Sequence, residues 1–442
     1  MSNTVIFRKK VFGTARLNVR FPNANVLLLA TLEGGLLQEK LEEAIVRVSK
    51  KHLLMNSNIN VDADNAVWYE INNGMKPAVY CTQDTKDLDK IMIAELKTPF
   101  NLEEGPLVRF NIMGTEDKTH LLISCHHAIC DGLSLVYLAN DLLTAIAYPE
   151  KEINGAAKPI VQDESAIPEK VKKGFLMKLM INSMNKKWQK RDLPFTKVMY
   201  TDIHTEFWKK HHPGIIRWGL SKEQTSKLVK QSKKNGVTVN TAIATAFVRA
   251  QNEISDRQFY SDDVTVSVSM RDYLEESPED AMGFFASAVR PALKYSIEKS
   301  FWDNAVKFHK QIKSLMTEKN IFDSQVIGFF NPKFLDALVL GRYGKNDDKT
   351  VRKMIARKKM DVINTAFTLS NLGRVNVPAD FDGLKLTSLM GPVVYGDSME
   401  KYIGVITING QMFFSISFNQ DIVGKDKMEE VKNKVIEYIE QM

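Results

Sequence analysis

The sequence predicts a mixed α/β fold that is built as two α/β halves. Strand-like and helix-like patterns of apolar residues alternate along all 442 residues. A chain of this length exceeds what one hydrophobic core usually supports, so two units are expected. Residues 148–168 contain three prolines and a glycine, which is typical of a linker. We therefore place a boundary near residue 160, between an N-terminal half, 1–160, and a C-terminal half, 161–442.

The elements of the N-terminal half follow from the spacing of its apolar residues. Short, strongly apolar runs indicate buried strands, and apolar positions three and four residues apart indicate one face of a helix. The polar run Asp62–Asn65 is typical of a hairpin turn. The expected elements are, in order, a strand at 25–32, a helix over 37–48, a hairpin over 58–71, strands at 106–113 and 119–125, and a helix at 133–148.

The C-terminal half continues the alternation. Ser221 and Gln224 have capping-box spacing at the start of a helix, and Asn235 with Gly236 ends it. The other expected elements are strands at 215–220, 263–270, 361–369, 402–408 and 412–418, and helices at 240–250 and 425–439.

The most informative motif lies at the corner between the strand at 119–125 and the helix at 133–148. It consists of His126, His127, Asp131 and Gly132. Adjacent strand residues face opposite ways, so only one imidazole can enter a given cavity, and no Cys or Glu at ligand spacing completes a zinc set. Asp131 suits a helix N-cap and Gly132 permits a tight bend. A neutral imidazole near a bound hydroxyl or amine can act as a general base, so we expect acid–base chemistry without a metal.

A second histidine pair, His211 and His212, serves as a comparison. It lacks the aspartate and precedes a Pro-Gly sequence, which is typical of a loop. We expect no catalytic role for it.

The motif resembles the signature His-His-x-x-x-Asp-Gly of a superfamily of acyltransferases. This superfamily includes the condensation domains of non-ribosomal peptide synthetases, the alcohol acetyltransferases and, more distantly, chloramphenicol acetyltransferase. Further runs resemble family elements in the same order, although Ser287 stands where many members have asparagine. They are the strand entry at 100–109, the strand ending in arginine at 264–271, the Gly-Phe element at 282–285 and the Ser-Asn-x-Gly turn at 370–373.

The resemblance implies an architecture and a set of roles. Two chloramphenicol-acetyltransferase-like α/β halves would form a pseudo-dimer around a substrate tunnel. His127 would face the tunnel as the general base, while His126 would pack away from it. Asp131 would pair with an arginine, for which Arg271 is the candidate, to hold the loop. The alternatives are a simple helix cap for Asp131 and a hydrogen-bonded structural histidine for His127.

Two further residues, Gly132 and Asn371, are candidates for contacts with the substrates. The backbone N–H of Gly132 is a candidate donor to the oxyanion that forms during acyl transfer. Asn371 of the Ser-Asn-Leu-Gly run could orient the acceptor or the thioester, as the resemblance implies, or could simply be a turn residue.

The function predicted from the resemblance is transfer of an acyl group from a thioester to a small-molecule alcohol or amine. Acyl-coenzyme A is the favoured donor, because the Ser-Asn-Leu-Gly run resembles the alcohol acetyltransferase branch. A stand-alone condensation enzyme that uses phosphopantetheinyl carrier proteins is the close alternative, and a non-catalytic member that binds an acyl ligand or a partner protein is the third. No permanently bound cofactor is expected, and the residues that would contact the coenzyme are not assigned.

Charge and composition suggest further properties. The net charge of +7 is concentrated at 169–191, where eight basic residues accompany one acid and many apolar residues. Such a helix could meet an anionic membrane, an acidic carrier protein or the phosphates of coenzyme A, although we favour a solvated surface helix. The basic stretch 352–359 is similar, and no motif supports nucleic-acid binding.

The three cysteines, Cys81, Cys125 and Cys130, are expected to be reduced packing residues. The sequence contains no apolar run long enough to span a membrane, and its first residues lack the apolar core of a secretion signal. We therefore expect a cytoplasmic protein.

Overall fold

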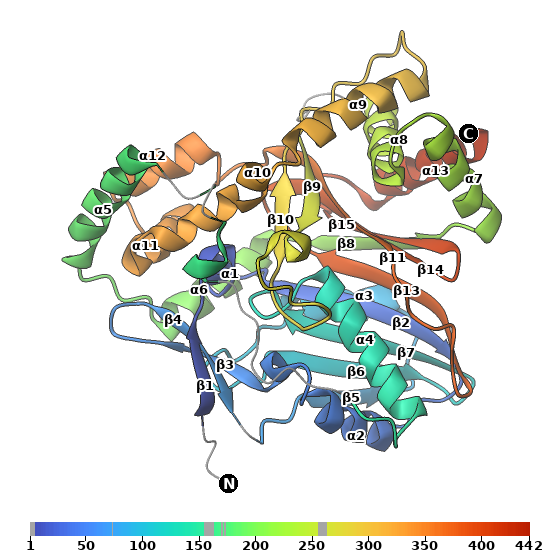
Figure 1. The fold of residues 1–442 in the computed structure, drawn as a ribbon, viewed down its shortest axis with the longest axis horizontal. Helices are drawn as coiled ribbons and strands as arrows, with labels where there is room; N and C mark the ends of the chain where they lie inside the picture. Colours follow the sequence, from blue (N-terminus) through green and yellow to red (C-terminus); the bar gives the residue numbers. More distant parts are fainter. Residues whose placement is uncertain (1–4, 73, 154–162, 169–170, 172–173, 255–262) are drawn as a thin grey trace.

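The computed structural model describes residues 5–72, 74–153, 163–168, 171, 174–254 and 263–442 (Figure 1). The expected boundary near residue 160 lies outside the described residues. The predicted mixed α/β fold is confirmed, because two six-stranded sheets lie one above the other and helices pack on both of them.

The first sheet has the strand order β12-β13-β2-β7-β6-β5. Helices α2 (Gln38–Val48) and α4 (Gly132–Ala147) pack on one face of it, and α3 (Leu88–Lys97) packs on the other. Two of its strands come from beyond residue 161, so the C-terminal part of the chain completes the sheet of the N-terminal half. The strands are β2 (Asn25–Glu33), β5 (Ala78–Thr82), β6 (Val108–Gly114), β7 (Lys118–His126), β12 (Asp380–Phe381) and β13 (Leu384–Val394).

The second sheet has the strand order β10-β9-β11-β14-β15-β8. Its core lies under four helices, α7 (Lys222–Lys234), α8 (Val239–Ile254), α9 (Phe301–Leu315) and α13 (Lys425–Gln441). Its strands are β8 (Pro213–Gly219), β9 (Val264–Ser269), β10 (Ala286–Val289), β11 (Thr365–Arg374), β14 (Met399–Ile408) and β15 (Gln411–Asn419).

Several elements lie outside these two layers, and sequence patterns did not predict most of them. A small sheet contains the expected hairpin, with a third strand added at its edge. A group of helices forms a separate lobe, seen at the left of Figure 1. These elements are β1 (Val5–Lys10), β3 (Ser57–Val61), β4 (Val67–Asn72), α1 (Gly13–Asn18), α5 (Phe175–Gln189), α6 (Lys197–Lys210), α10 (Glu318–Phe322), α11 (Pro332–Arg342) and α12 (Lys349–Lys358).

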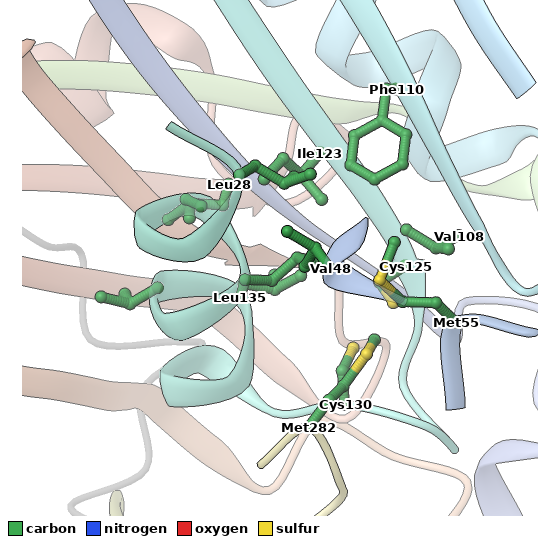
Figure 2. Packing of buried hydrophobic residues seen from close by; sticks show 14 of the residues in the cluster. Leu28, Val48, Met55, Val108, Phe110, Ile123, Cys125, Cys130, Leu135 and Met282 are labelled. Atoms are coloured by element: carbon green, nitrogen blue, oxygen red, sulfur yellow. The ribbon is translucent and has the colours of Figure 1, made fainter. Parts of the chain in front are cut away.

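Strand β2 shows why the first sheet is so strongly apolar. Successive side chains of a strand face opposite sides. Leu28 therefore joins the core beneath α4, whereas Leu27 joins the core beneath α3. Figure 2 shows Leu28 with Ile123 of β7 and Leu135 of α4 in the first of these cores. The motif corner follows directly from this buried strand pair.

Two local expectations are wrong. The run Ser370–Gly373 lies within β11 instead of in a turn, and the strand register shifts there because Gly373 has a φ of 73°. Cys125 and Cys130 are free and buried, but Cys81 is exposed on the edge strand β5 and is not a packing residue.

Within the described ranges, no helix combines the length and the apolar character that a bilayer-spanning helix requires. The same residues contain no group of three His, Cys, Asp or Glu side chains arranged to hold a metal ion.

Candidate active site

The motif corner is held by backbone hydrogen bonds from several elements. The N–H of His126 donates to the carbonyl of Leu107 at 2.9 Å, and the N–H of His127 donates to that of Ala24 at 2.7 Å. The hydroxyl of Tyr69 donates to the carbonyl of Ala128 at 2.6 Å. Because these bonds fix both peptide planes, the two imidazoles are held in different surroundings.

His126 points into the core. Its side chain is buried and meets the ring of Phe100 edge-on, and its Nδ1 accepts from the N–H of Ala128 at 3.2 Å. Burial, with smaller contributions from His127 and Arg109, lowers the pKa of His126 to about 3. The imidazole is therefore neutral, and it lies away from the partly exposed side of the corner.

His127 keeps partial exposure and has a defined tautomer. Its Nδ1 lies 2.8 Å from the carbonyl oxygen of Cys130, which can only accept, so Nδ1 carries the proton. No partner for Nε2 is found among the residues that the structure describes. Burial lowers the pKa of His127, while the Cys130 carbonyl and the Asp131 carboxylate oppose that shift. The lone pair on Nε2 is thus free to accept a proton at neutral pH.

Asp131 fulfils both of the roles considered for it. One oxygen, Oδ1, accepts from the N–H and the hydroxyl of Ser134, each at 2.8 Å, and so caps α4. The same oxygen lies 3.3 Å from Nη2 of Arg271, and Oδ2 accepts from the N–H of Phe285 at 3.1 Å. The carboxylate and the guanidinium are both buried. The pair therefore connects the start of α4 to the second half of the chain.

Ser134 is a contact point that sequence reasoning missed. Its hydroxyl lies 2.9 Å from Nη2 of Arg271, and 3.1 Å and 2.8 Å from the N and O of Gly283. Its position two residues after the motif glycine could have drawn attention to Ser134. Sequence spacing alone, however, does not show what a buried hydroxyl contacts.

Residues 280–285, which we call the strap, cross from the second half to the motif. The N–H of Met282 donates to Nδ1 of His52 at 3.2 Å, and the ring of Phe284 meets the His127 ring edge-on at 5.0 Å. Lys51 Nζ lies 2.6 Å from Asp280. The strap therefore places an aromatic wall beside the candidate base.

Gly132 is required for space and not for a bend. Its φ is not positive, which corrects the expectation from sequence. A Cβ at this position would lie 2.9 Å from Cγ of Pro392 and 3.1 Å from Cδ2 of Leu372. The N–H of Gly132 belongs to the first turn of α4, where N–H groups have no acceptor within the helix.

Asn371 lies beside this contact, because its neighbour Leu372 packs on Gly132. Its Oδ1 accepts from the N–H of Gly373 at 2.9 Å and stabilises the bulge in β11. Of the two roles considered for Asn371, this contact with the nearby backbone is the one expected of a turn residue.

One face of the second sheet carries hydroxyl groups. Strand register places Thr368 of β11 opposite Tyr402 of β14, and Tyr402 opposite Ser417 of β15. In the next row Ser370 and Ser415 flank Gly404 in the same way. Directly opposed residues share a face, so these side chains form a group that we call the hydroxyl face.

The hydroxyl face looks toward the first sheet. Ser417 donates to the carbonyl of Val394 in β13, and Asp131 acts on Tyr402 electrostatically. Burial raises the pKa of Tyr402 to about 12, so its hydroxyl stays protonated. A sequence signal for this face is the alternation of hydroxyl and apolar residues at 264–269, because strand pairing places Thr265 of β9 opposite Thr368.

A cavity of about 250 Å³ lies between α6, α11 and the loop after β13. Its lining includes Phe207, His211, Arg342 and Asp397, whereas His127 is not among the lining residues. His211 stacks on Phe207, and its Nδ1 lies 3.1 Å from the hydroxyl of Tyr395. The second histidine pair is therefore in a loop, as expected, but one member borders a cavity.

Comparisons with known proteins agree with this geometry. The family model of the condensation domain matches residues 23–322. Gramicidin S synthase 2 of Brevibacillus brevis is 28% identical over 123 residues, which are 28% of this chain and 3% of the synthase. Bacitracin synthase 1 of Bacillus licheniformis is 21% identical over 290 residues, which are 61% of this chain and 5% of that synthase. The chain thus corresponds to a small part of these relatives.

Solved structures share the fold at low sequence identity. The epimerization domain from the third module of tyrocidine synthetase B has a TM-score of 0.64 at 13% identity, covering 100% of this chain and 98% of that one. The trichothecene 15-O-acetyltransferase from Fusarium sporotrichioides has a TM-score of 0.66 at 13% identity, covering 98% and 95%. With the family match over most of the chain, these findings show that the protein belongs to the condensation domain family.

Proposed function

We propose that this protein transfers an acyl group from a thioester to an alcohol or amine, with His127 as the general base. The observation that carries the proposal is the tautomer of His127. Nδ1 donates to the Cys130 carbonyl at 2.8 Å, so the free lone pair lies on Nε2 of a partly exposed ring. A fixed, neutral imidazole of this kind is suited to accept a proton from an attacking hydroxyl or amine.

The proposed reaction uses this one imidazole twice. Nε2 accepts the acceptor's proton as its oxygen or nitrogen attacks the thioester carbonyl carbon. The carbonyl oxygen then becomes an oxyanion, for which the N–H of Gly132 at the N-terminus of α4 is the proposed donor. When the intermediate collapses, the C–S bond breaks and the thiolate takes the proton from Nε2. The Cys130 carbonyl keeps the ring in place while it is transiently positive.

The proposed substrate passage runs between the two halves, with 1–160 on one side and 161–442 on the other. The hydroxyl face supports this location, because its buried Ser and Thr side chains and the half-buried Tyr402 offer hydrogen bonds to amide and hydroxyl groups of a ligand. Thr368 Oγ1 and Ser415 Oγ are buried and have no hydrogen-bond partner among the described residues. Buried polar atoms without partners are uncommon, so they indicate where polar ligand atoms could bind.

Two donors carry the same reactive thioester. Acyl-coenzyme A is the donor that we propose first, from the resemblance of the run Ser370–Gly373 to the alcohol acetyltransferase branch. A phosphopantetheinyl carrier protein is the second candidate, and the similarity to peptide synthetases favours it. The third candidate is a member that binds an acyl thioester or a partner protein without turnover.

The test measures thiol release from an acyl-coenzyme A panel with alcohol and amine acceptors, and in parallel from acylated carrier protein. We expect His127→Ala to lower turnover by about a hundred-fold to ten-thousand-fold, because general-base assistance is of that size. The matched control is His212→Ala, since His212 is an exposed histidine that pairs with Asp421 on the surface. Wild-type turnover in a folded His127→Ala variant would show that His127 is not the base.

The donor panel separates the three candidates. Turnover of coenzyme A thioesters identifies the first donor, and turnover of carrier-bound thioesters alone identifies the second. Binding of either thioester without turnover, at equal affinity in wild type and His127→Ala, would identify a non-catalytic protein.

A further inference from the structure

Helices α5 and α12 pack on α11 and leave a broad outer surface, which Figure 1 shows at the left edge of the molecule. We define the α5–α12 face as the exposed residues within 177–190 and 349–358. This surface lies on the helical lobe, outside both sheets and apart from the motif corner. The proposed acyl transfer gives it no role.

The helices of this face are firmly seated. Trp188 of α5 is fully buried, and its ring lies 5.3 Å from that of Phe334 of α11. Ile355 of α12 is also buried in this cluster. Arg191, just after α5, lies 2.7 Å from Asp348, the N-cap of α12. The two helices are therefore fixed relative to one another, and their outward residues form one surface.

The charge of this surface has a single sign. Residues 177–190 contain four lysines and residues 349–358 contain five lysines and arginines, and neither segment contains Asp or Glu. These segments together carry more positive charge than the net +7 of the whole chain. All of the cations of the face are exposed, and among the described residues none of them forms an ion pair, whereas Arg191 at its edge pairs with Asp348. The face is therefore complementary to a strongly anionic partner.

The first turns of α5 add exposed apolar groups to this charge. Met177, Leu179 and Met180 are 40%, 50% and 48% exposed. At about 100° per residue, Met177 and Met180 lie on one side of the helix, whereas Leu179 lies about 100° from Met180 and about 160° from Met177 around the axis. A protein groove binds one apolar stripe of a helix. The interfacial region of a bilayer, in contrast, surrounds an inserted helix end and accepts apolar groups on several sides.

We propose that the α5–α12 face binds an anionic lipid membrane. The exposed lysines and arginines contact lipid phosphates, while Met177, Leu179 and Met180 enter the boundary between headgroups and acyl chains. The structure thus changes the preference drawn from sequence, because part of the apolar surface of α5 is not packed on the protein. This inference does not depend on the proposed acyl transfer.

The experiment is co-sedimentation of the full chain with phosphatidylcholine vesicles, with and without phosphatidylserine. We expect binding to the anionic vesicles only. The charge-reversal variant carries Lys186→Glu, Lys187→Glu, Arg352→Glu and Lys353→Glu. Each basic residue near an anionic membrane raises the partition coefficient about five-fold, so reversing four of these charges should abolish measurable binding.

The matched control reverses the same number of exposed cations on α7, another lysine-rich helix. It carries Lys222→Glu, Lys230→Glu, Lys233→Glu and Lys234→Glu, and we expect vesicle binding close to that of the wild type. A third variant, Leu179→Ser with Met180→Ser, keeps all charges and should bind several-fold more weakly, since apolar burial adds to the electrostatic attraction. We expect each variant to fold, because all of the replaced side chains are exposed, and thermal unfolding checks this.

Three outcomes would overturn the proposal. The first is no binding of the wild type to anionic vesicles. The second is an equal loss of binding in the α5–α12 and α7 variants, which would show attraction to net charge alone. The third is binding to an immobilised acidic acyl carrier protein, lost in the α5–α12 variant, with no vesicle binding. That result would assign the face to a protein partner.

Discussion

Replacing Asp131 by alanine tests the central polar contact of the motif. The change removes an acceptor of two hydrogen bonds from Ser134 and one from Phe285, and it leaves Arg271 without its carboxylate. The side chains of Asp131 and Arg271 are only 4% and 6% exposed. Breaking a buried pair by removing one partner costs about 3–5 kcal/mol. Because domains are stable by about 5–15 kcal/mol, this is a large part of the total.

Urea unfolding, followed by circular dichroism, measures this loss. The matched control is Asp272→Ala, which removes an exposed carboxylate from the residue next to Arg271 and should change the free energy of unfolding by less than about 0.5 kcal/mol. Arg271→Met removes the cation instead, and the double variant removes both charges. We expect the double variant to lose less stability than the sum of the single changes, by about 1–3 kcal/mol.

Two results would refute this reasoning. One is a loss below about 1 kcal/mol for Asp131→Ala, since this is no more than a helix cap alone contributes. The other is strict additivity in the double variant, which would mean that Asp131 and Arg271 do not interact.

Three further predictions concern the same corner. Because the pKa of His127 is lowered, activity should persist below the ordinary imidazole pKa of 6.5 and fall only at lower pH, which a profile of kcat/KM against pH measures. His126 has a pKa of about 3 in the fold and of about 6.5 in the unfolded chain, so the free energy of unfolding should decline as the pH falls from 6.5 toward 3. In urea titrations at several pH values, His126→Leu should flatten that decline. An unchanged dependence of stability on pH in this variant would contradict the prediction. Gly132→Ala should lower the free energy of unfolding by about 1–3 kcal/mol, because its Cβ meets Pro392. At Gly424, the N-cap of α13, nothing lies within 4 Å of an added Cβ, so Gly424→Ala should cost only the cap preference, below about 1 kcal/mol. Equal effects in thermal unfolding would rule out the steric explanation.

Sequence patterns predicted the elements that bury one regular face. Strand β2 and helix α4 are strongly apolar at the expected spacing, so their positions agree with the prediction within one or two residues. Helices α11 and α12 were not predicted. Residues 334–340 of α11 are all buried, so this run has no helical period, and α12 buries only Val351 and Ile355 among basic residues. Strand β13 was also missed, and its pairing with β2 joins residues more than 350 positions apart. Periodicity carries no information about such a partner.

The site was predictable in its residues but not in all of its contacts. The motif named the two histidines, and strand alternation indicated that only one of them would face a substrate. The pairing of Asp131 with Arg271 came from the family resemblance and is present as a contact at 3.3 Å. Ser134 and the strap were missed because their importance lies in buried hydrogen bonds between distant segments, which have no local signature in a single sequence.

The arrangement also explains why the two halves of the chain depend on one another. His127 belongs to the first half, but the aromatic wall at its side, Phe284, and the cation that holds Asp131 come from the second. Without the strap, the hydroxyl of Ser134 would lose its contacts with Gly283. Without β13, one edge of β2 would be open, and an apolar strand with an unpaired edge favours aggregation. A cut near residue 160 therefore divides the sequence at its most linker-like segment, but it does not yield two units that can each complete the site.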